Sequence, residues 1–319
     1  MFKLVAYSRL SDGLKQVLDQ SCDVTVFNGI TKENERAFKE ALQNAEGLLG
    51  AGLPITESLL KHAPRLRYVG NVSAGYDNFD LEAMSAHGVM AVNAPNALTD
   101  TTADLIFGLV LSSARRITEL DRFVRAKKWQ TGIKADRFGV NVHHKTIGII
   151  GMGRIGRAVA QRAARGFDME VLYTKRHRDV KAEQELGITY KSLTELLQTS
   201  DFVCITLPLT AETHHFIDDK ELKMMKPSAI LVNGGRGPII NEQALIRALQ
   251  DKTILGAGLD VYEQEPLSLD SPLLQLDNVV LAPHIGSATE ETRTKMAEEA
   301  VHNLLQFING EQPNNLLNP

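Results

Sequence analysis

Three charged residues in the second half of the chain have the chemistry of an acid–base site. Arg236 lies in the turn Gly-Gly-Arg-Gly, Glu265 in Glu-Gln-Glu-Pro and His284 in Ala-Pro-His-Ile-Gly, and each follows a short apolar segment. A guanidinium can bind a carboxylate and polarise a carbonyl, and an imidazole can donate a proton near neutral pH. A carboxylate beside the imidazole favours its protonated form and fixes the ring. These residues therefore suit the reduction of a small 2-oxo acid by hydride transfer.

A glycine-rich turn precedes all three residues in the sequence. The turn, Gly-Met-Gly-Arg-Ile-Gly over 151–156, follows the apolar segment 146–150 and opens a helical pattern over 154–165, with Gly166 as the expected C-cap. In such a turn the first glycine permits the sharp bend, the second lets a pyrophosphate approach, and the third lets helix and strand pack closely. A tight turn without a ligand is the less favoured alternative. The predicted cofactor-binding residues of the turn are Gly151, Gly153, Arg154, Ile155 and Gly156.

The end of the next predicted strand indicates which cofactor binds. An NAD site usually carries an acidic residue there, about 20 residues after the glycine turn. This chain has Thr174 instead, followed by Lys175, Arg176, His177 and Arg178. Cationic side chains attract a 2′-phosphate through charge-assisted hydrogen bonds. The sequence therefore favours NADPH over NADH, with Thr174, Lys175 and Arg176 at the cofactor, and a solvated charged loop is the alternative.

Short apolar segments alternate with amphipathic ones along the chain, which predicts parallel sheets whose strands are joined by helices. Strands are expected over 3–7, 23–27, 47–50, 66–69, 89–92, 146–150, 169–173, 202–207, 229–232, 255–259 and 279–282. Helical patterns cover 32–44, 56–62 and a long stretch over 99–126. Capping boxes mark helix starts at Ser192 and Ser287. We predict an α/β fold of two doubly wound parallel-sheet domains, the second a Rossmann dinucleotide-binding domain.

The overall composition narrows the function classes. The chain has 319 residues, enough for two domains, and its net charge of −4 includes no block rich in Lys and Arg. We therefore expect no nucleic-acid partner and no membrane partner. The first residues, 1–7, predict a strand rather than a signal peptide. Cys22 and Cys204 fit no metal or redox spacing, so we expect a cytoplasmic protein without a metal site.

From about residue 71 to 293 the chain resembles the D-isomer-specific 2-hydroxyacid dehydrogenases. The motifs that carry the resemblance lie, in order, at 151–156, 233–237, 258–261 with 263–266, and 283–286. The resemblance implies Arg236 as the substrate anchor, His284 as the acid/base and Glu265 as its partner. It also implies residues at the substrate carboxylate and in the cofactor cleft. These are the backbone amides of Ser73, Ala74 and Gly75 for the carboxylate, and Thr102, Leu207, Pro208, Thr213 and Asp260 for the cleft.

The resemblance further implies a substrate class and a domain organisation. Within the family, the similarity is closest to the reductases of glyoxylate and hydroxypyruvate, including those that reduce 2-ketogluconate. The expected domains are a discontinuous substrate-binding domain, 1–98 plus 290–319, and a dinucleotide-binding domain, 99–289. The alternatives are a nucleotide-sensing protein similar to the C-terminal-binding corepressors and a D-3-phosphoglycerate dehydrogenase. The three charged residues alone do not separate these functions, whereas a turnover assay does.

A homodimer is the expected assembly. The stretch 99–126 carries a wide apolar stripe that one domain is not expected to bury alone. The stripe consists of Leu105, Ile106, Leu109, Val110 and Ala114. In the resembling family this region forms a two-fold dimer. A tryptophan in this region reaches the neighbouring active site in similar reductases, although Trp129 would more ordinarily be a packing anchor.

Overall fold

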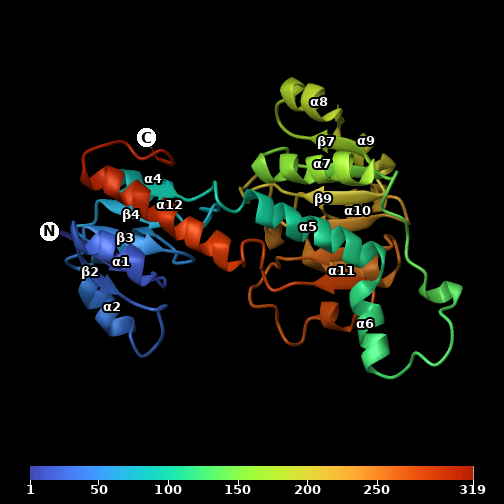
Figure 1. Ribbon diagram of the computed structural model, residues 1–319, viewed down its shortest axis with the longest axis horizontal. Helices are drawn as coiled ribbons and strands as arrows, with labels where there is room; N and C mark the ends of the chain where they lie inside the picture. Colours follow the sequence, from blue (N-terminus) through green and yellow to red (C-terminus); the bar gives the residue numbers. More distant parts are fainter. Residues whose placement is uncertain (319) are drawn as a thin grey trace. The chain divides into compact units, whose positions relative to one another are not determined.

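The computed structural model describes residues 1–318 and divides the chain into two compact units. The first unit comprises Met1–Leu98 together with the chain from Ser287 onward, and the second is Thr99–Gly286. Each unit is built on its own parallel sheet, and helices cover it (Figure 1). No helix among these 318 residues is both long and apolar enough to cross a bilayer.

The first unit has a five-stranded parallel sheet in the order β2-β1-β3-β4-β5. Its strands are β1 (Phe2–Ala6), β2 (Cys22–Val26), β3 (Gly47–Gly50), β4 (Tyr68–Asn71) and β5 (Met90–Asn93). Its helices are α1 (Asp12–Asp19), α2 (Glu35–Leu42), α3 (Glu57–His62), α4 (Leu81–Ala86) and α12 (Glu290–Ile308). The last helix, α12, returns to this unit and packs against β4, β5 and α1 (Figure 1). The apolar side chains Ala300, Val301 and Leu304 of α12 are buried in that contact.

The second unit has a seven-stranded sheet in the order β12-β11-β10-β9-β6-β7-β8. Its strands are β6 (Thr146–Ile150), β7 (Glu170–Thr174), β8 (Thr189–Tyr190), β9 (Phe202–Ile205), β10 (Ile230–Asn233), β11 (Gly256–Leu259) and β12 (Val279–Leu281). Its helices are α5 (Thr99–Ala114), α6 (Ile117–Arg125), α7 (Arg154–Phe167), α8 (Val180–Leu186), α9 (Leu193–Thr199), α10 (Asp219–Met224) and α11 (Glu242–Gln250), with short 3₁₀ turns at Ala135–Arg137, Gly237–Ile239 and Pro272–Gln275. The strand order reverses between β6 and β9, which is where open α/β sheets bind ligands. The predicted fold class, two doubly wound parallel-sheet units, is confirmed.

The long helix predicted over 99–126 is wrong, because the structure breaks it into α5 and α6. Arg116 lies between them with a left-handed φ of 56°. Its guanidinium donates to Glu119 at 2.7 and 2.8 Å and to the carbonyl oxygen of Asp136 at 2.6 Å. These bonds hold the turn between the helices and fix the segment that follows α6.

The apolar stripe on this stretch is also buried differently from the prediction. Helix α5 lies beside α7 and across β10 and β11 (Figure 1), so the second unit's own sheet covers the stripe. Ile106 and Val110 are fully buried there, and Leu109 and Ala114 are nearly so. Four of the five residues of the stripe therefore need no second subunit to remove them from water, and Leu105 is partly buried.

One predicted helix end was shifted and one predicted helix start was wrong. Helix α7 runs through Gly166 to Phe167, and Asp168, with a φ of 49°, ends it instead. The box predicted at Ser287 is wrong, because Thr289 caps α12 by accepting a hydrogen bond from the amide of Thr292 at 3.2 Å. The capping box at Ser192 is confirmed.

Candidate active site

The glycine turn joins the end of β6 to the start of α7. Gly151 has a φ of +100°, a conformation that other residues rarely adopt. A Cβ atom on Gly156 would lie 2.1 Å from the carbonyl oxygen of Gly151, so only glycine allows α7 to pack this closely on the strand end. A Cβ atom on Gly153 would meet nothing within 4 Å. Arg154 begins α7 directly after it, and Ile155 is half-buried. Open space at the helix N-terminus fits a dinucleotide pyrophosphate.

The loop after β9 borders this turn. The hydroxyl of Thr206 donates to the carbonyl oxygen of Gly151, and the amide nitrogen of Leu207 would lie 3.1 Å from a Cβ atom on that glycine. Further along, the hydroxyl of Thr213 donates to the carbonyl oxygen of Pro208 at 2.8 Å, which closes the loop on itself. The structure thus places Leu207 beside the glycine turn, with Pro208 and Thr213 further along the same loop.

Arg236, Glu265 and His284 follow three strands that are neighbours in the sheet. Asn233 at the end of β10 pairs with Leu259 of β11, and Leu259 pairs with Leu281 of β12. Because the strands are parallel, their carboxyl ends lie at one edge, the same edge that carries the glycine turn after β6. The sheet therefore gathers the three residues where α/β sheets bind ligands.

The imidazole of His284 is bonded to the carboxylate of Glu265, with 2.6 Å between Nδ1 and Oε2. The other carboxylate oxygen of Glu265 accepts a hydrogen bond from the amide of Tyr262 at 3.1 Å. Burial alone would raise the pKa of Glu265, but the bonds from His284 and the Tyr262 amide, with the charges of His284 and Arg236, outweigh it and lower the pKa. The imidazole side chain is 47 % exposed, and within residues 1–318 nothing is bonded to its Nε2. That nitrogen can therefore meet a substrate oxygen.

Asp260 builds the turn that presents His284. Its buried carboxylate accepts hydrogen bonds from the amides of Ile285 at 2.7 Å and Gly286 at 2.9 Å. Its backbone oxygen accepts from the amide of His284 at 2.9 Å, and His284 itself has a left-handed φ of 54°. Burial raises the pKa of Asp260, although the two amides and His284 act against this shift. The hydroxyl of Thr102 on α5 donates to the carbonyl oxygen of Gly286 at 3.0 Å and ties the same turn to α5.

The turn that carries Arg236 is held against the loop of Glu265. The side chain of Asn233 accepts from the amide of Gly235 at 3.0 Å and donates to the carbonyl oxygen of Arg236 at 2.9 Å. The guanidinium of Arg236 donates to the carbonyl oxygen of Gly235 at 3.0 Å. A Cβ atom on Gly237 would lie 1.8 Å from the carbonyl oxygen of Tyr262, so this glycine allows the two backbones to touch. The guanidinium and the His284–Glu265 pair are therefore fixed by one packed group of loops.

This geometry agrees with the comparisons to known proteins. The family model for "D-isomer specific 2-hydroxyacid dehydrogenase, NAD binding domain" matches residues 107–286. A protein of Yersinia pestis (strain Pestoides F) named glyoxylate/hydroxypyruvate reductase B is 53% identical over 316 residues, which cover 99% of this chain and 97% of that protein. The chain belongs to the D-isomer-specific 2-hydroxyacid dehydrogenase family.

Two solved structures resemble this dehydrogenase over nearly its whole length. The glyoxylate reductase of Paecilomyes thermophila has a TM-score of 0.89 at 30% identity and covers 99% of this chain and 98% of its own. The NADPH-dependent glyoxylate/hydroxypyruvate reductase of Sinorhizobium meliloti, in complex with NADP and malonate, has a TM-score of 0.85 at 28% identity, with coverages of 99% and 96%.

The cationic segment of the dehydrogenase lies directly after β7, which ends at Thr174. The ammonium of Lys175 donates to the carbonyl oxygen of Met152 in the glycine turn at 3.3 Å, and Arg176 is exposed. Arg178 differs from both, because its guanidinium is bonded to Glu183 at 2.8 and 2.7 Å. The structure thus brings Thr174, Lys175 and Arg176 to the glycine turn's edge of the sheet.

The loop 73–75 belongs to the first unit and follows β4. Its carbonyl oxygens are all hydrogen-bonded: Ser73 accepts from the amide of Ala94 at 3.0 Å, and the side chains of Asn93 and Asn71 donate to Ala74 and Gly75 at 2.7 Å each. Within residues 1–318 the three amides of the loop donate no hydrogen bond. The loop therefore offers donors rather than acceptors.

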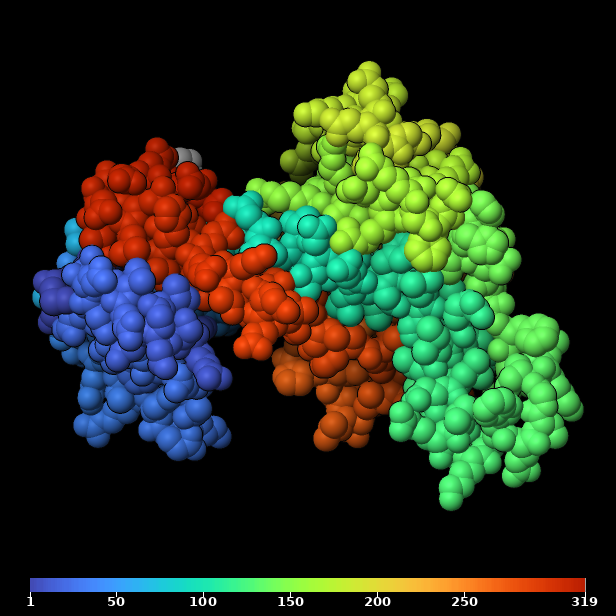
Figure 2. Space-filling model, in the orientation of Figure 1, coloured from blue at the N-terminus to red at the C-terminus, as the bar shows by residue number. Residues whose placement is uncertain are grey.

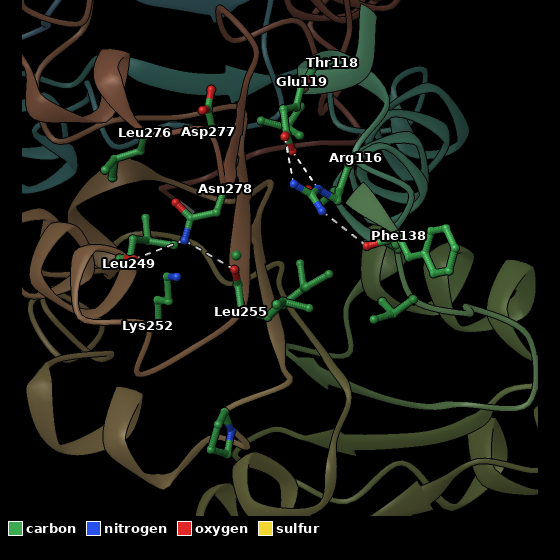
Figure 3. A pocket seen from close by; sticks show the side chains of 18 of the residues that line it. Arg116, Thr118, Glu119, Phe138, Leu249, Lys252, Leu255, Leu276, Asp277 and Asn278 are labelled. Carbon is green, nitrogen blue, oxygen red and sulfur yellow. Dashed lines mark hydrogen bonds and ion pairs between the residues drawn. The ribbon is translucent and has the colours of Figure 1, made fainter. Parts of the chain in front are cut away.

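A cavity of about 720 Å³ lies elsewhere in the second unit (Figure 3). It is lined at the opposite edge of the sheet, by residues at the starts of β10 and β11 such as Ile230 and Gly256, and by Arg116, Glu119 and Phe138. It contains none of the predicted catalytic residues.

The sequence prediction missed the residues that hold the catalytic loops in place. Tyr262 donates its backbone amide to Glu265, and its hydroxyl donates to the carbonyl oxygen of Ala282, two residues before His284. Asn233 acts in the same way, and so does Asp260, which was predicted for the cofactor cleft but not for this role. A buried polar residue directly at or after a strand end was the available signal, since such groups are normally hydrogen-bonded.

Proposed function

We propose that this dehydrogenase reduces a small 2-oxo acid to the D-2-hydroxy acid with NADPH. Glyoxylate and hydroxypyruvate are the first candidates for the substrate, and 2-ketogluconate is a further one. The observation that carries the proposal is the 2.6 Å pair of His284 and Glu265, at the strand ends next to the Arg236 turn and on the same edge as the glycine turn. The names of the relatives support the substrate class.

Each residue of the site has a distinct role in this reaction. Arg236 binds the substrate carboxylate and polarises the ketone, and the unbonded amides of the loop 73–75 bind the same carboxylate. His284 donates a proton from Nε2 to the carbonyl oxygen. Glu265 stabilises the charged imidazole and holds its ring through Nδ1. A bound nicotinamide cofactor supplies the hydride.

The preference for NADPH rests on the segment after β7. A carboxylate at position 174 would repel a 2′-phosphate, whereas the hydroxyl of Thr174 and the charges of Lys175 and Arg176 attract it. The NADPH-dependent relative of Sinorhizobium meliloti supports this preference, and NADH is the weaker alternative.

A steady-state assay tests the proposal. Purified enzyme is supplied with glyoxylate, hydroxypyruvate or 2-ketogluconate and with NADPH or NADH, and oxidation of the nicotinamide is followed by absorbance. The expected result is turnover of at least one of the three acids, with a higher kcat/KM for NADPH and a product of D configuration. No turnover of any 2-oxo acid would refute the reductase assignment and favour a nucleotide-sensing protein.

A homodimer is proposed on different grounds from the stripe on α5. Helix α6 buries none of its residues, and apolar side chains along it and along the following segment are exposed; these are Ile117, Val124, Trp129, Ile133 and Phe138. Figure 2 shows this segment, in green, on the surface at the lower right. A second copy of the chain would cover these side chains. Light scattering at micromolar concentration is expected to give twice the mass of the chain, and a monomeric mass would contradict the proposal.

A reducing, cytoplasmic setting is also proposed. Cys22 and Cys204 are both free thiols, and both are buried in separate units.

A further inference from the structure

The segment that follows β7 is anchored by a cluster of three side chains, Tyr173, Arg178 and Glu183. The hydroxyl of Tyr173 donates to the carboxylate of Glu183 at 2.8 Å and accepts from the amide of Asp179 at 2.7 Å. The guanidinium of Arg178 donates to both oxygens of Glu183, at 2.8 and 2.7 Å. The cluster therefore connects β7 to α8 across the cationic loop 174–179.

A second set of contacts fixes the same loop on its inner side. Asp179 caps α8 by accepting from the amide of Ala182 at 3.0 Å. Its carboxylate also lies 3.6 Å from the ammonium of Lys175, which donates to the carbonyl oxygen of Met152. The loop is thus tied at its far end to α8 and at its near end to the glycine turn.

Two of the three side chains of the cluster are shielded from solvent, whereas Arg178 is 62% exposed. Tyr173 is fully buried, and its ring lies edge-on to that of Tyr190 at 5.5 Å between centroids. The carboxylate side chain of Glu183 is 14% exposed. Arg178 and Tyr173 lower the pKa of Glu183 to about 2, so the carboxylate is charged at any pH at which the enzyme is assayed.

The charge balance within the loop follows from these contacts. The guanidinium of Arg178 donates both hydrogen bonds to Glu183, so the positive and the negative charge of this pair largely cancel. Arg176, two residues earlier, is exposed, and within residues 1–318 no carboxylate is hydrogen-bonded to it, although its charge acts on Glu212. The cationic segment is therefore divided into a structural cation, Arg178, and cations that a ligand can reach.

We propose that Tyr173, Glu183 and Arg178 are positioning residues that set the preference for NADPH over NADH. They hold the loop in the conformation in which Lys175 and Arg176 meet the 2′-phosphate. The inference rests on the proposed function, because it assumes that the loop binds the cofactor's ribose. A loop that is ordered before binding loses less conformational entropy when the phosphate docks. NADH has no 2′-phosphate, so its binding gains little from the ordered loop.

Two conservative variants, Tyr173→Phe and Glu183→Gln, test the proposal. Both are expected to lower kcat/KM for NADPH by about three- to tenfold, the effect of one lost hydrogen bond of about 1 kcal/mol. The kcat/KM for NADH is expected to stay within about twofold of the parent, and kcat at saturating NADPH is expected to stay unchanged. Glu185→Gln is the matched control, since it removes the same charge from the same helix, where Glu185 pairs with Arg157 and Lys181 instead.

A direct binding measurement keeps the test independent of turnover. The dissociation constants of NADPH and NADH are measured for the parent, both variants and the control, from the nicotinamide fluorescence. Thermal unfolding shows whether each variant is folded. The two variants disturb the cluster from opposite sides, so either variant is enough for the test if the other does not fold. If the parent reduces no 2-oxo acid, the proposed function fails, while these constants still decide whether the cluster sets the preference.

Three outcomes would overturn the inference. An equal loss for NADPH and NADH would give the cluster a merely structural role. Unchanged constants for both cofactors would show that the loop needs no anchor. A stronger preference for NADPH in Glu183→Gln would mean that the released Arg178 binds the phosphate itself.

Discussion

Replacing Glu265 by Gln tests the negative charge of the acid–base pair. The amide oxygen of Gln can still accept the hydrogen bond from His284 Nδ1, which in the parent spans 2.6 Å, so the ring keeps its orientation. The variant loses the negative charge that stabilises the imidazolium, and it also loses the second carboxylate oxygen that accepts from the Tyr262 amide. In the direction of reduction the protonated ring is the acid, so kcat/KM should fall at a lower pH in the variant than in the parent. The basic limb of the pH profile is therefore expected to move to lower pH.

The size of this movement follows from the exposure of the pair. A charge-assisted hydrogen bond contributes roughly 1.5–3 kcal/mol, and one pH unit corresponds to about 1.4 kcal/mol. The His284 and Glu265 side chains are 47% and 35% exposed, so solvent screening reduces the value toward the lower end. We therefore expect kcat/KM at a fixed pH on the basic limb to be about tenfold lower in the variant than in the parent. Burial raises the pKa of Glu265, but the bonds from His284 and the Tyr262 amide outweigh burial and keep that pKa below its ordinary value. The basic limb of the pH profile therefore does not report this carboxylate.

The measurement is kcat/KM for reduction of glyoxylate or hydroxypyruvate between about pH 5 and 10, for parent and variant. Glu263→Gln is the control, because Glu263 lies in the same loop but is bonded to His215 at 2.7 Å instead of His284. The control is expected to leave the limb in place. A basic limb that does not move in Glu265→Gln, or that moves to higher pH, would refute the role assigned to the carboxylate.

Three further predictions concern the acid, the cofactor and the glycine turn. His284→Ala is expected to lower turnover by about 10²–10⁴-fold, the usual contribution of a general acid, with the dissociation constant of NADPH nearly unchanged; full activity would contradict the assignment. The double variant Thr174→Asp with Arg176→Ala is expected to invert the NADPH preference in kcat/KM. The parent's preference for NADPH should weaken at high salt. Equal efficiency of the parent with both cofactors would mean that these cations form only a solvated loop. Gly156→Ala should lower the unfolding temperature, because its Cβ atom would lie 2.1 Å from the carbonyl oxygen of Gly151. Gly153→Ala should weaken only cofactor binding, because its Cβ atom would meet nothing within 4 Å. Similar unfolding temperatures for the two variants would contradict the packing argument.

The strand ends could be predicted from the sequence because two patterns agreed there. Apolar, β-branched segments alternate with amphipathic ones, and the charged residues come directly after these segments. Parallel strands then bring Arg236, Glu265 and His284 to one edge without any knowledge of the strand order. The 2.6 Å bond between His284 and Glu265 could not be predicted in this way. It depends on β11 and β12 being neighbours and on the turn that Asp260 holds.

Helix ends were harder to predict because neighbouring residues offer equivalent signals. Ser287 has Glu290 three residues later, and Thr289 is an equally good cap two residues further on. The structure uses Thr289, whose hydroxyl is bonded to the first turn of α12. The break at Arg116 had no local signal at all, since arginine favours helices and the amphipathic pattern continues through it. Its left-handed backbone is held by bonds to Glu119, three residues away, and by a tertiary contact with the backbone at 136.

The cationic segment shows the same limit at the candidate site. Lys175, Arg176 and Arg178 look alike in sequence, and each could pair with a phosphate. Only the fold reveals that Glu183, one helical turn into α8, lies where it accepts both donors of Arg178. A cation that a carboxylate of the protein already holds through two short hydrogen bonds is less available to a ligand. The number of positive charges after β7 is therefore a poor guide to cofactor preference. The preference depends on which of these cations the loop leaves accessible to the cofactor.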